Sequence, residues 1–152
     1  MIRDKCDQDS VDSIINQGYP VNSEALDELL SWTCDPNWPI AASIYGYFVR
    51  LGEKEVQRVL SLADRADEGW RYSLITNLIA QYSDAIVEMC TDHLQRWAKQ
   101  PGSDECDFES LRVLSERKLL SDTEIKEIAH KNVQTYQLWI EETLQVCDVS
   151  GE

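Results

Sequence analysis

The chain has 152 residues, 43% of them hydrophobic, and its 14 basic and 28 acidic residues give a formal net charge of −14 and a pI near 4.4. We expect a chain of this size to form one domain, residues 1–152, with a substantial core. No apolar run is long enough to span a bilayer, and the N-terminus lacks the apolar region of a secretory signal, so we expect a cytoplasmic protein.

The negative net charge indicates which classes of partner to expect. So acidic a surface repels nucleic acid and anionic membranes, which excludes both as expected partners. It favours a basic protein partner and steers that partner at long range. The alternative is that the acidity serves solubility alone.

Helical periodicity and helix-ending residues divide the chain into about eight helices, and no segment shows the alternation of a strand. The longest break runs from residue 99 to 107, and Ser121 with Glu124 has the spacing of a capping box before the last helix. The expected helices cover residues 11–17, 23–32, 38–51, 53–63, 70–82, 84–98, 108–118 and 122–148.

One junction between helices occurs twice. Asp35-Pro36-Asn37-Trp38 returns thirty-two residues later, in weaker form, as Asp67-Glu68-Gly69-Trp70. Around the first copy, the apolar pair Leu29-Leu30 ends one helix and Leu51-Gly52 ends the next, which is the order of a HEAT unit. Such units leave one face uncovered and must stack. We therefore predict an all-α, HEAT-like superhelix of stacked antiparallel helix hairpins; the alternative is an ordinary helical bundle with a coincidental repeat.

Leu29-Leu30-x-Trp32, followed by Asp35-x-Asn37-Trp38-Pro39-Ile40-Ala41, forms the most specific motif. Further landmarks follow in order: Arg3-Asp4-Lys5-x-Asp7, Gly18-Tyr19-Pro20, Asp67-Glu68-x-Trp70 and Pro101-x-Ser103-x-Glu105. Together they resemble a small bacterial family of uncharacterised HEAT-like helical domains. The resemblance covers residues 3–111 and leaves 112–152 as a C-terminal helical extension. It implies the HEAT-like fold, no assigned enzymatic activity, and a likeness to helical immunity proteins of bacterial toxin systems.

The candidate partner-binding residues lie at these junctions and in the long break. Trp38 and Trp70 either fill the gap between adjacent hairpins, which we favour, or anchor a partner at the rim of a groove. Stacked units would align polar side chains along one edge, although helix capping explains the same residues. This predicted acidic edge consists of Asp35, Asn37, Asp64, Asp67, Glu68, Asp104, Glu105 and Asp107.

The cysteines and histidines predict neither disulfides nor a metal site. Five cysteines stand at irregular spacings, which argues against a secreted disulfide framework and for reduced thiols. Cys90 and His93 lie one helical turn apart, but no second pair of this kind accompanies them. We expect Cys90 in the core and His93 on the surface, and no metal or cofactor.

No residue set predicts catalysis. The glycines are scattered rather than gathered in a phosphate-binding loop, and His130 has no partner in a nucleophile motif. We therefore expect a non-catalytic protein-binding domain, monomeric when free, and an immunity protein that neutralises a basic toxin, as in toxin–antitoxin or contact-dependent inhibition systems. A cytosolic HEAT-like adaptor or scaffold is the alternative. A HEAT-like DNA-processing enzyme would need Lys and Arg in its groove, which the charge of −14 disfavours.

Overall fold

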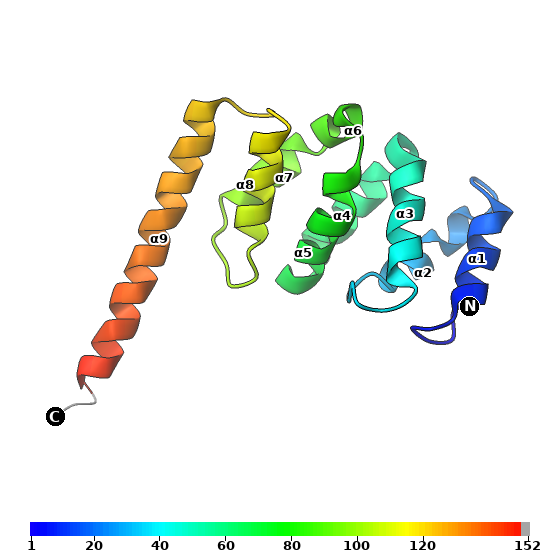
Figure 1. Cartoon of the computed structure of the whole chain (residues 1–152), viewed down its shortest axis with the longest axis horizontal. Helices are drawn as coiled ribbons and strands as arrows, with labels where there is room; N and C mark the ends of the chain where they lie inside the picture. Colours follow the sequence, from blue (N-terminus) through cyan, green and yellow to red (C-terminus); the bar gives the residue numbers. More distant parts are fainter. Residues whose placement is uncertain (150–152) are drawn as a thin grey trace. The chain divides into compact units, whose positions relative to one another are not determined.

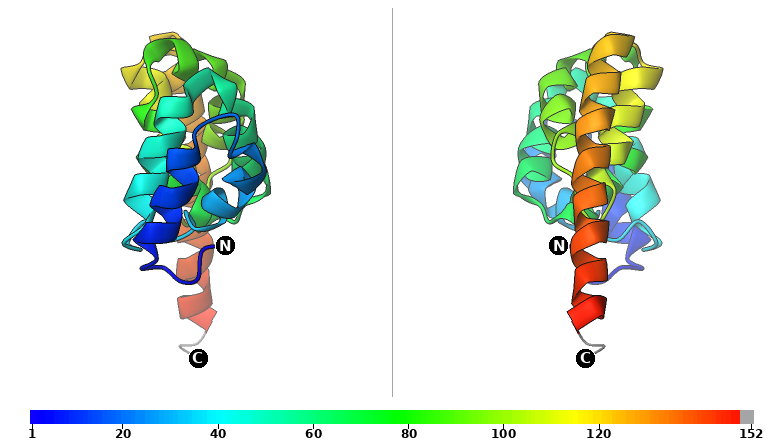
Figure 2. Two further views of the ribbon diagram at one scale, coloured as in Figure 1. Left: turned by 90° about the vertical axis from the view of Figure 1, so that its right-hand side faces the viewer. Right: turned by 90° about the vertical axis from the view of Figure 1, so that its left-hand side faces the viewer.

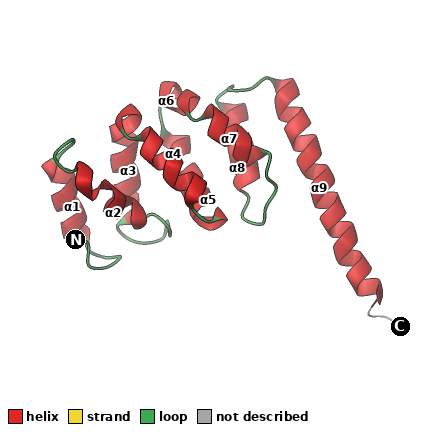
Figure 3. Cartoon of the chain, turned by 180° about the vertical axis from the view of Figure 1, so that it is seen from behind, coloured by secondary structure: helices red, strands yellow, loops and turns green. Residues whose placement is uncertain are grey.

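The structure, a computed structural model, describes residues 1–149. Every regular element in this range is a helix, so the all-α class is confirmed (Figure 3). None of the helices in this range combines the length and apolarity needed to cross a membrane. The chain divides into two compact units, Met1–Cys90 and a second that begins at Thr91.

Six α-helices and three short 3-10 turns build the first unit (Figure 1). Helix α4 packs against the next helix, α5, as expected of a helix hairpin, and α1 packs against α3. Stacking of such pairs into a superhelix stays a prediction. The elements are α1 (Gln8–Gln17), η1 (Ser23–Ala25), α2 (Leu26–Ser31), α3 (Ala41–Leu51), η2 (Gly52–Lys54), α4 (Val56–Arg65), α5 (Glu68–Asn77), η3 (Ile79–Gln81) and α6 (Asp84–Met89).

The core of this unit comes from the apolar faces that periodicity predicted. Removing each such side chain from water contributes about 1.5–3 kcal/mol, which offsets the entropy lost on ordering the short helices. Buried Asn22 adds a polar tie, because its Nδ2 donates to the Ile14 carbonyl oxygen at 2.9 Å and to the Tyr47 hydroxyl at 2.7 Å. The fully buried side chains include Leu26, Leu29, Ile40, Ile44, Phe48, Leu60, Leu74, Ile75, Leu78 and Ile79.

The N-terminal segment is fixed by one carboxylate. Asp7 is buried and caps α1, accepting the Ser10 backbone N–H at 3.3 Å. It also accepts the backbone N–H of Arg3 at 2.9 Å and the Arg3 guanidinium at 2.8 and 2.9 Å. These bonds hold the pKa of Asp7 well below its usual range. Because Asp7 is the cap, α1 begins three residues before the predicted start at Val11.

The second unit contains α7 (Thr91–Ala98), α8 (Cys106–Glu116) and α9 (Asp122–Val149). Helix α8 packs against both of the others. The predicted capping box at the start of α9 is confirmed: the Ser121 N–H and hydroxyl donate to Glu124 Oε2 at 2.9 and 2.8 Å, and the Glu124 N–H donates back to Ser121 Oγ at 3.3 Å.

The predicted helix over 84–98 is two helices. Cys90 donates its N–H to the Val87 carbonyl oxygen three residues earlier, at 2.9 Å, so the α-helical ladder tightens and stops there. The break makes nine α-helices within residues 1–149 instead of about eight. It also falls where the first compact unit ends.

Helix α9 is longer than the helices it packs against. At 1.5 Å per residue, its 28 residues span about 42 Å, whereas the 11 residues of α8 span about 16 Å. Its C-terminal half therefore runs past α7 and α8, as Figures 1 and 2 show. Every side chain from 137 to 148 is exposed.

Candidate partner-binding surfaces

The first junction is a closed turn between α2 and α3. Asp35 Oδ1 accepts the Asn37 N–H at 2.9 Å, and its carbonyl oxygen accepts the Trp38 N–H at 3.2 Å. Half-buried Trp38 packs its ring against Trp32, with centroids 5.5 Å apart. These turns occupy the residues before α3, so the helix begins at Ala41 rather than at the predicted Trp38.

The second junction caps α5. Asp67 Oδ1 accepts the Trp70 N–H at 2.8 Å, and Glu68 lies in the first helical turn, where a negative charge favours the helix dipole. Both carboxylates are exposed. Arg71 caps the C-terminal end of α4, because its Nε donates to the Ala63 carbonyl oxygen at 2.8 Å.

The two junctions are hydrogen-bonded to each other. Trp70 Nε1 donates to Thr33 Oγ1 at 3.0 Å, and the same hydroxyl donates to the Leu30 carbonyl oxygen at 2.6 Å. The Thr33 carbonyl oxygen accepts the Tyr45 hydroxyl at 2.7 Å. Thr33 is buried, so these bonds satisfy groups that water does not reach. Trp70 therefore has a structural role, since it joins the segment after α2 to the start of α5.

Asp35 and Asp67 both raise the pKa of the Cys34 thiol. Burial raises the pKa of Cys34, and the negative charges of Asp35 and Asp67 raise it further. Both junction carboxylates therefore act electrostatically on Cys34. Asn37, Asp67 and Glu68 are exposed and Asp35 and Asp64 half-buried, so the first unit carries five members of the predicted acidic edge at its surface.

The other three members belong to the second unit. Asp104 and Glu105 are exposed. Asp107 is only 2% exposed, because its Oδ2 accepts the Tyr136 hydroxyl at 2.6 Å and the Asn132 amide at 3.4 Å. A partner cannot reach this carboxylate, so placing Asp107 on an exposed edge was wrong.

The metal-capable side chains do not gather. Cys90 is buried, its Sγ lies 3.4 Å from the Ile86 carbonyl oxygen, and burial raises its pKa to about 12. Within residues 1–149 no group of three His, Cys, Asp or Glu side chains is arranged to hold a metal ion.

Sequence reasoning missed an aromatic pocket in the second unit. Phe108, Tyr136 and Trp139, with Gly102, Ser103 and Glu105, line a space of about 540 Å³, which we call the aromatic pocket. Phe108 and Trp139 are 59% and 43% exposed. The ring of Tyr136 lies 5.4 Å from that of Trp139 at 85°, so the two form adjacent walls. The sequence did contain one signal of it. The apolar pattern of α9 is longer than either neighbouring helix, so part of that apolar face has to remain uncovered.

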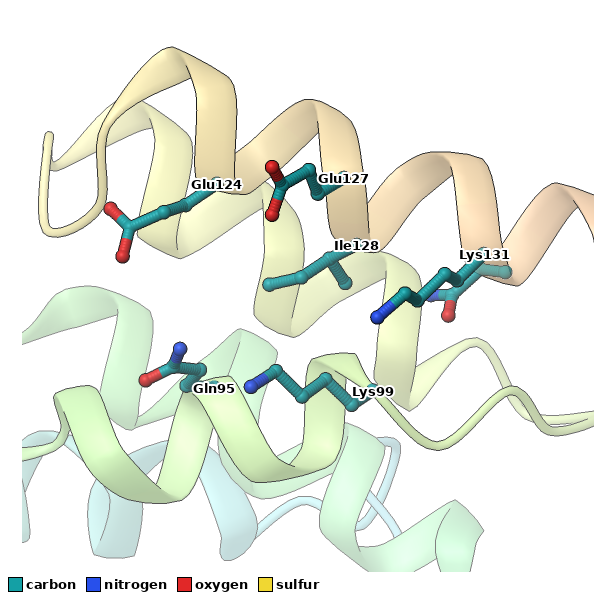
Figure 4. Close-up of a pocket in the computed structure, with 7 residues that line it drawn as sticks. Gln95, Lys99, Glu124, Glu127, Ile128 and Lys131 are labelled. Atoms are coloured by element: carbon teal, nitrogen blue, oxygen red, sulfur yellow. The ribbon is translucent and has the colours of Figure 1, made fainter.

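A second cleft, of about 450 Å³, lies between α7 and α9 (Figure 4). Lys99, just after α7, and Lys131 from α9 reach into it, as do Glu124 and Glu127. Two positive and two negative side chains compensate one another, so this cleft selects no charge. The aromatic pocket, in contrast, is lined by one charged side chain, Glu105.

The described residues define an all-helical protein of paired helices with acidic candidate surfaces. The chain belongs to the family described as Domain of unknown function (DUF5071), which it matches over residues 1–119. The match ends before α9 begins. No curated protein and no solved structure matches the chain.

Proposed function

We propose that the protein is a non-catalytic, cytoplasmic binding protein that neutralises a basic protein partner, and that this partner is a bacterial toxin to which it confers immunity. Charge carries the proposal: the net charge is −14. Toxins that attack nucleic acids are often basic, since they bind phosphates, and an acidic surface can cover their substrate cleft.

Exposed carboxylates support this proposal further. In the first unit, Asp67 is held by its capping bond and Glu68 lies beside it, both exposed. In the second unit, Asp104 and Glu105 are exposed ahead of α8. A carboxylate held by a hydrogen bond, as Asp67 is, loses less side-chain entropy on binding than a mobile one, so it suits a partner with a matching Lys or Arg.

The direct test is co-expression with the product of the adjacent gene. We expect the two proteins to co-purify, and we expect cells that make the acidic protein to survive the toxin. Failure of the pair to bind, or survival that is no better than in cells without the acidic protein, would remove the immunity proposal.

Charge-neutral variants test the surface. We expect Glu68→Gln combined with Asp104→Asn to weaken binding and to reduce its salt dependence, because each charge contributes to attraction of a basic partner. Glu24→Gln combined with Glu53→Gln is the matched control: both residues are exposed and lie outside the acidic edge. Equal loss in both double variants would indicate a general effect of net charge.

A cytosolic adaptor or scaffold remains the second candidate, favoured by the paired helices. We include in the proposal that these pairs stack as a HEAT-like superhelix and that Leu29-Leu30-x-Trp32 with Asp35-x-Asn37-Trp38-Pro39 is the family's signature. Genomic position discriminates the two functions: a gene directly downstream of a large toxin-like gene favours immunity, and an isolated gene favours an adaptor.

A further inference from the structure

The aromatic pocket combines three exposed or half-exposed rings with a carboxylate. Phe108 comes from the first turn of α8, and Tyr136 and Trp139 come from the middle of α9. An aromatic ring presents a negative face, so a cation placed among several rings is attracted to all of them. Glu105, at the N-terminal end of α8, lines the same pocket.

The surroundings of the pocket are negatively charged. Behind Tyr136 lies buried Asp107, which accepts the Tyr136 hydroxyl and the Asn132 amide, both neutral donors. Burial, the bond to Asp107 and the charges of Asp107 and Glu105 raise the pKa of Tyr136 to about 12. The basic residue one turn along α8, Arg112, is bound by Glu109 and Glu116. Glu105 itself is exposed at the pocket.

We propose that the aromatic pocket binds the guanidinium group of an arginine side chain from a basic protein partner. The planar guanidinium is weakly hydrated and stacks on aromatic faces, which a lysine ammonium does less well. The faces of Phe108, Tyr136 and Trp139 contact it, and Glu105 balances its charge. This inference rests on the proposed function, since it names one place where a basic partner binds.

The apolar stripe of α9, formed by Val133, Tyr136, Ile140 and Leu144, continues from the pocket. These residues are spaced three and four apart and so share one face of the helix. Val133, Ile140 and Leu144 are 52%, 59% and 58% exposed. The partner segment that carries the arginine therefore also has apolar side chains, which pack on this stripe. The stripe and the aromatic pocket together form one binding surface.

Charge decides between a basic partner and a second copy of this chain. The only charged side chains from 133 to 148 are Glu141, Glu142 and Asp148. Two copies paired antiparallel along this segment would bring their glutamates together, and like charges at such contacts are destabilising. A segment rich in arginine instead meets opposite charge along the same length.

Three peptides test the assignment with the full chain. Each is a short acetylated and amidated helical peptide of leucines and alanines with two basic positions flanking one central test position. The test position holds arginine, lysine or citrulline, which has the shape of arginine without its charge. By calorimetric titration at low salt we expect the arginine peptide to bind about tenfold more tightly than the citrulline peptide and about threefold more tightly than the lysine peptide. Equal affinities for arginine and citrulline, or for arginine and lysine, would overturn the assignment.

Variants locate the site. Trp139→Leu keeps an apolar side chain but removes the ring, and Glu105→Gln removes only the charge. We expect each to reduce the preference for arginine over citrulline about fivefold, with circular dichroism unchanged. Glu116→Gln is the matched control: it removes one negative charge at the other end of α8, about 16 Å away and outside the lining of the pocket. It should keep the wild-type preference.

The outcomes separate this inference from the proposed function. If wild-type protein binds the arginine peptide but Trp139→Leu and Glu105→Gln bind it equally well, the pocket assignment fails and a basic partner remains supported. If no peptide binds and no basic partner is found, both fail. Sedimentation gives the remaining test: a wild-type dimer that Trp139→Leu dissociates would assign the surface to a second copy and overturn the arginine proposal.

Discussion

Gly52 is the residue at which the backbone leaves least freedom for substitution. It ends α3 with a φ of 55°, and an added Cβ would lie 2.7 Å from Cδ1 of Ile86. We expect Gly52→Ala to lower the free energy of unfolding by about 1–3 kcal/mol, because both the left-handed conformation and the close contact oppose a side chain. Urea denaturation measures this. Gly46→Ala is the control, since an added Cβ there meets only Arg50 Nη1 at 3.5 Å and improves helix propensity.

Asp7 should make stability dependent on pH in the acid range. Its pKa in the folded protein is depressed by Arg3 and Ser10, whereas an unfolded Asp has a pKa of about 3.9. Its contribution is therefore fully present above about pH 5 and is lost progressively as pH falls through the unfolded pKa towards the lower folded pKa. We expect the stability difference between wild type and Asp7→Asn to be constant from about pH 7 to 5 and to shrink towards pH 2.

The matched variant for that series is Asp104→Asn, which removes an exposed carboxylate from a loop. Its stability difference from wild type should be small at every pH. A difference for Asp7→Asn that stays constant into strong acid would contradict the role of the Arg3–Asp7 interaction.

The environment of a single side chain could be predicted where residues close to it in the sequence determine it. Ser121 and Glu124 make the capping box that their spacing indicates, and Cys90 is buried as expected. Asp107 was misassigned because it follows Asp104 and Glu105 in an acidic stretch, while its burial depends on Tyr136 and Asn132, which come from another helix. Contacts of this kind have no local signal.

At the scale of the element, the start of α5 separates capping from partner binding. Asp67→Ala removes the bond to the Trp70 N–H and should cost about 1 kcal/mol of stability, measured by urea denaturation. Glu68→Gln removes the negative charge of the first helical turn but keeps the Asp67 cap, so we expect a smaller stability change, of about 0.5 kcal/mol. If the acidic edge binds a basic partner, both variants should bind that partner more weakly. Equal stability of the two variants would show that the cap contributes little.

Helix positions followed from periodicity more closely than helix ends did. The apolar faces of α3 and α4 are buried as predicted, because a 3.6-residue repeat has one core-facing side. The break at Cys90 had no counterpart in the sequence, since the apolar pattern continues through it; a tightened backbone bond ends α6 there. The aromatic pocket was missed because Phe108 and Trp139 belong to separate helices, and periodicity does not tell which part of a long face is covered.

At the scale of the whole molecule, an uncompensated charge of −14 opposes compaction. Raising NaCl from about 0.01 M to 0.15 M shortens the Debye length from roughly 30 to 8 Å and screens this repulsion. We expect the thermal midpoint to rise, by roughly 3 °C for each 1 kcal/mol gained. Near pH 4.4, where the net charge vanishes, the same addition should have little effect. A midpoint that falls with salt at pH 7 would mean that ion pairs outweigh the repulsion.

The bond between Trp70 and Thr33 also constrains how the sequence can drift over evolutionary time. The Thr33 hydroxyl both accepts from the indole and donates to a carbonyl, so Val at position 33 would leave Trp70 Nε1 without its acceptor. Replacement of Trp70 first would relax the demand for a hydroxyl. We therefore expect family members to change positions 33 and 70 together. Where the tryptophan is kept, the hydroxyl should be kept as well.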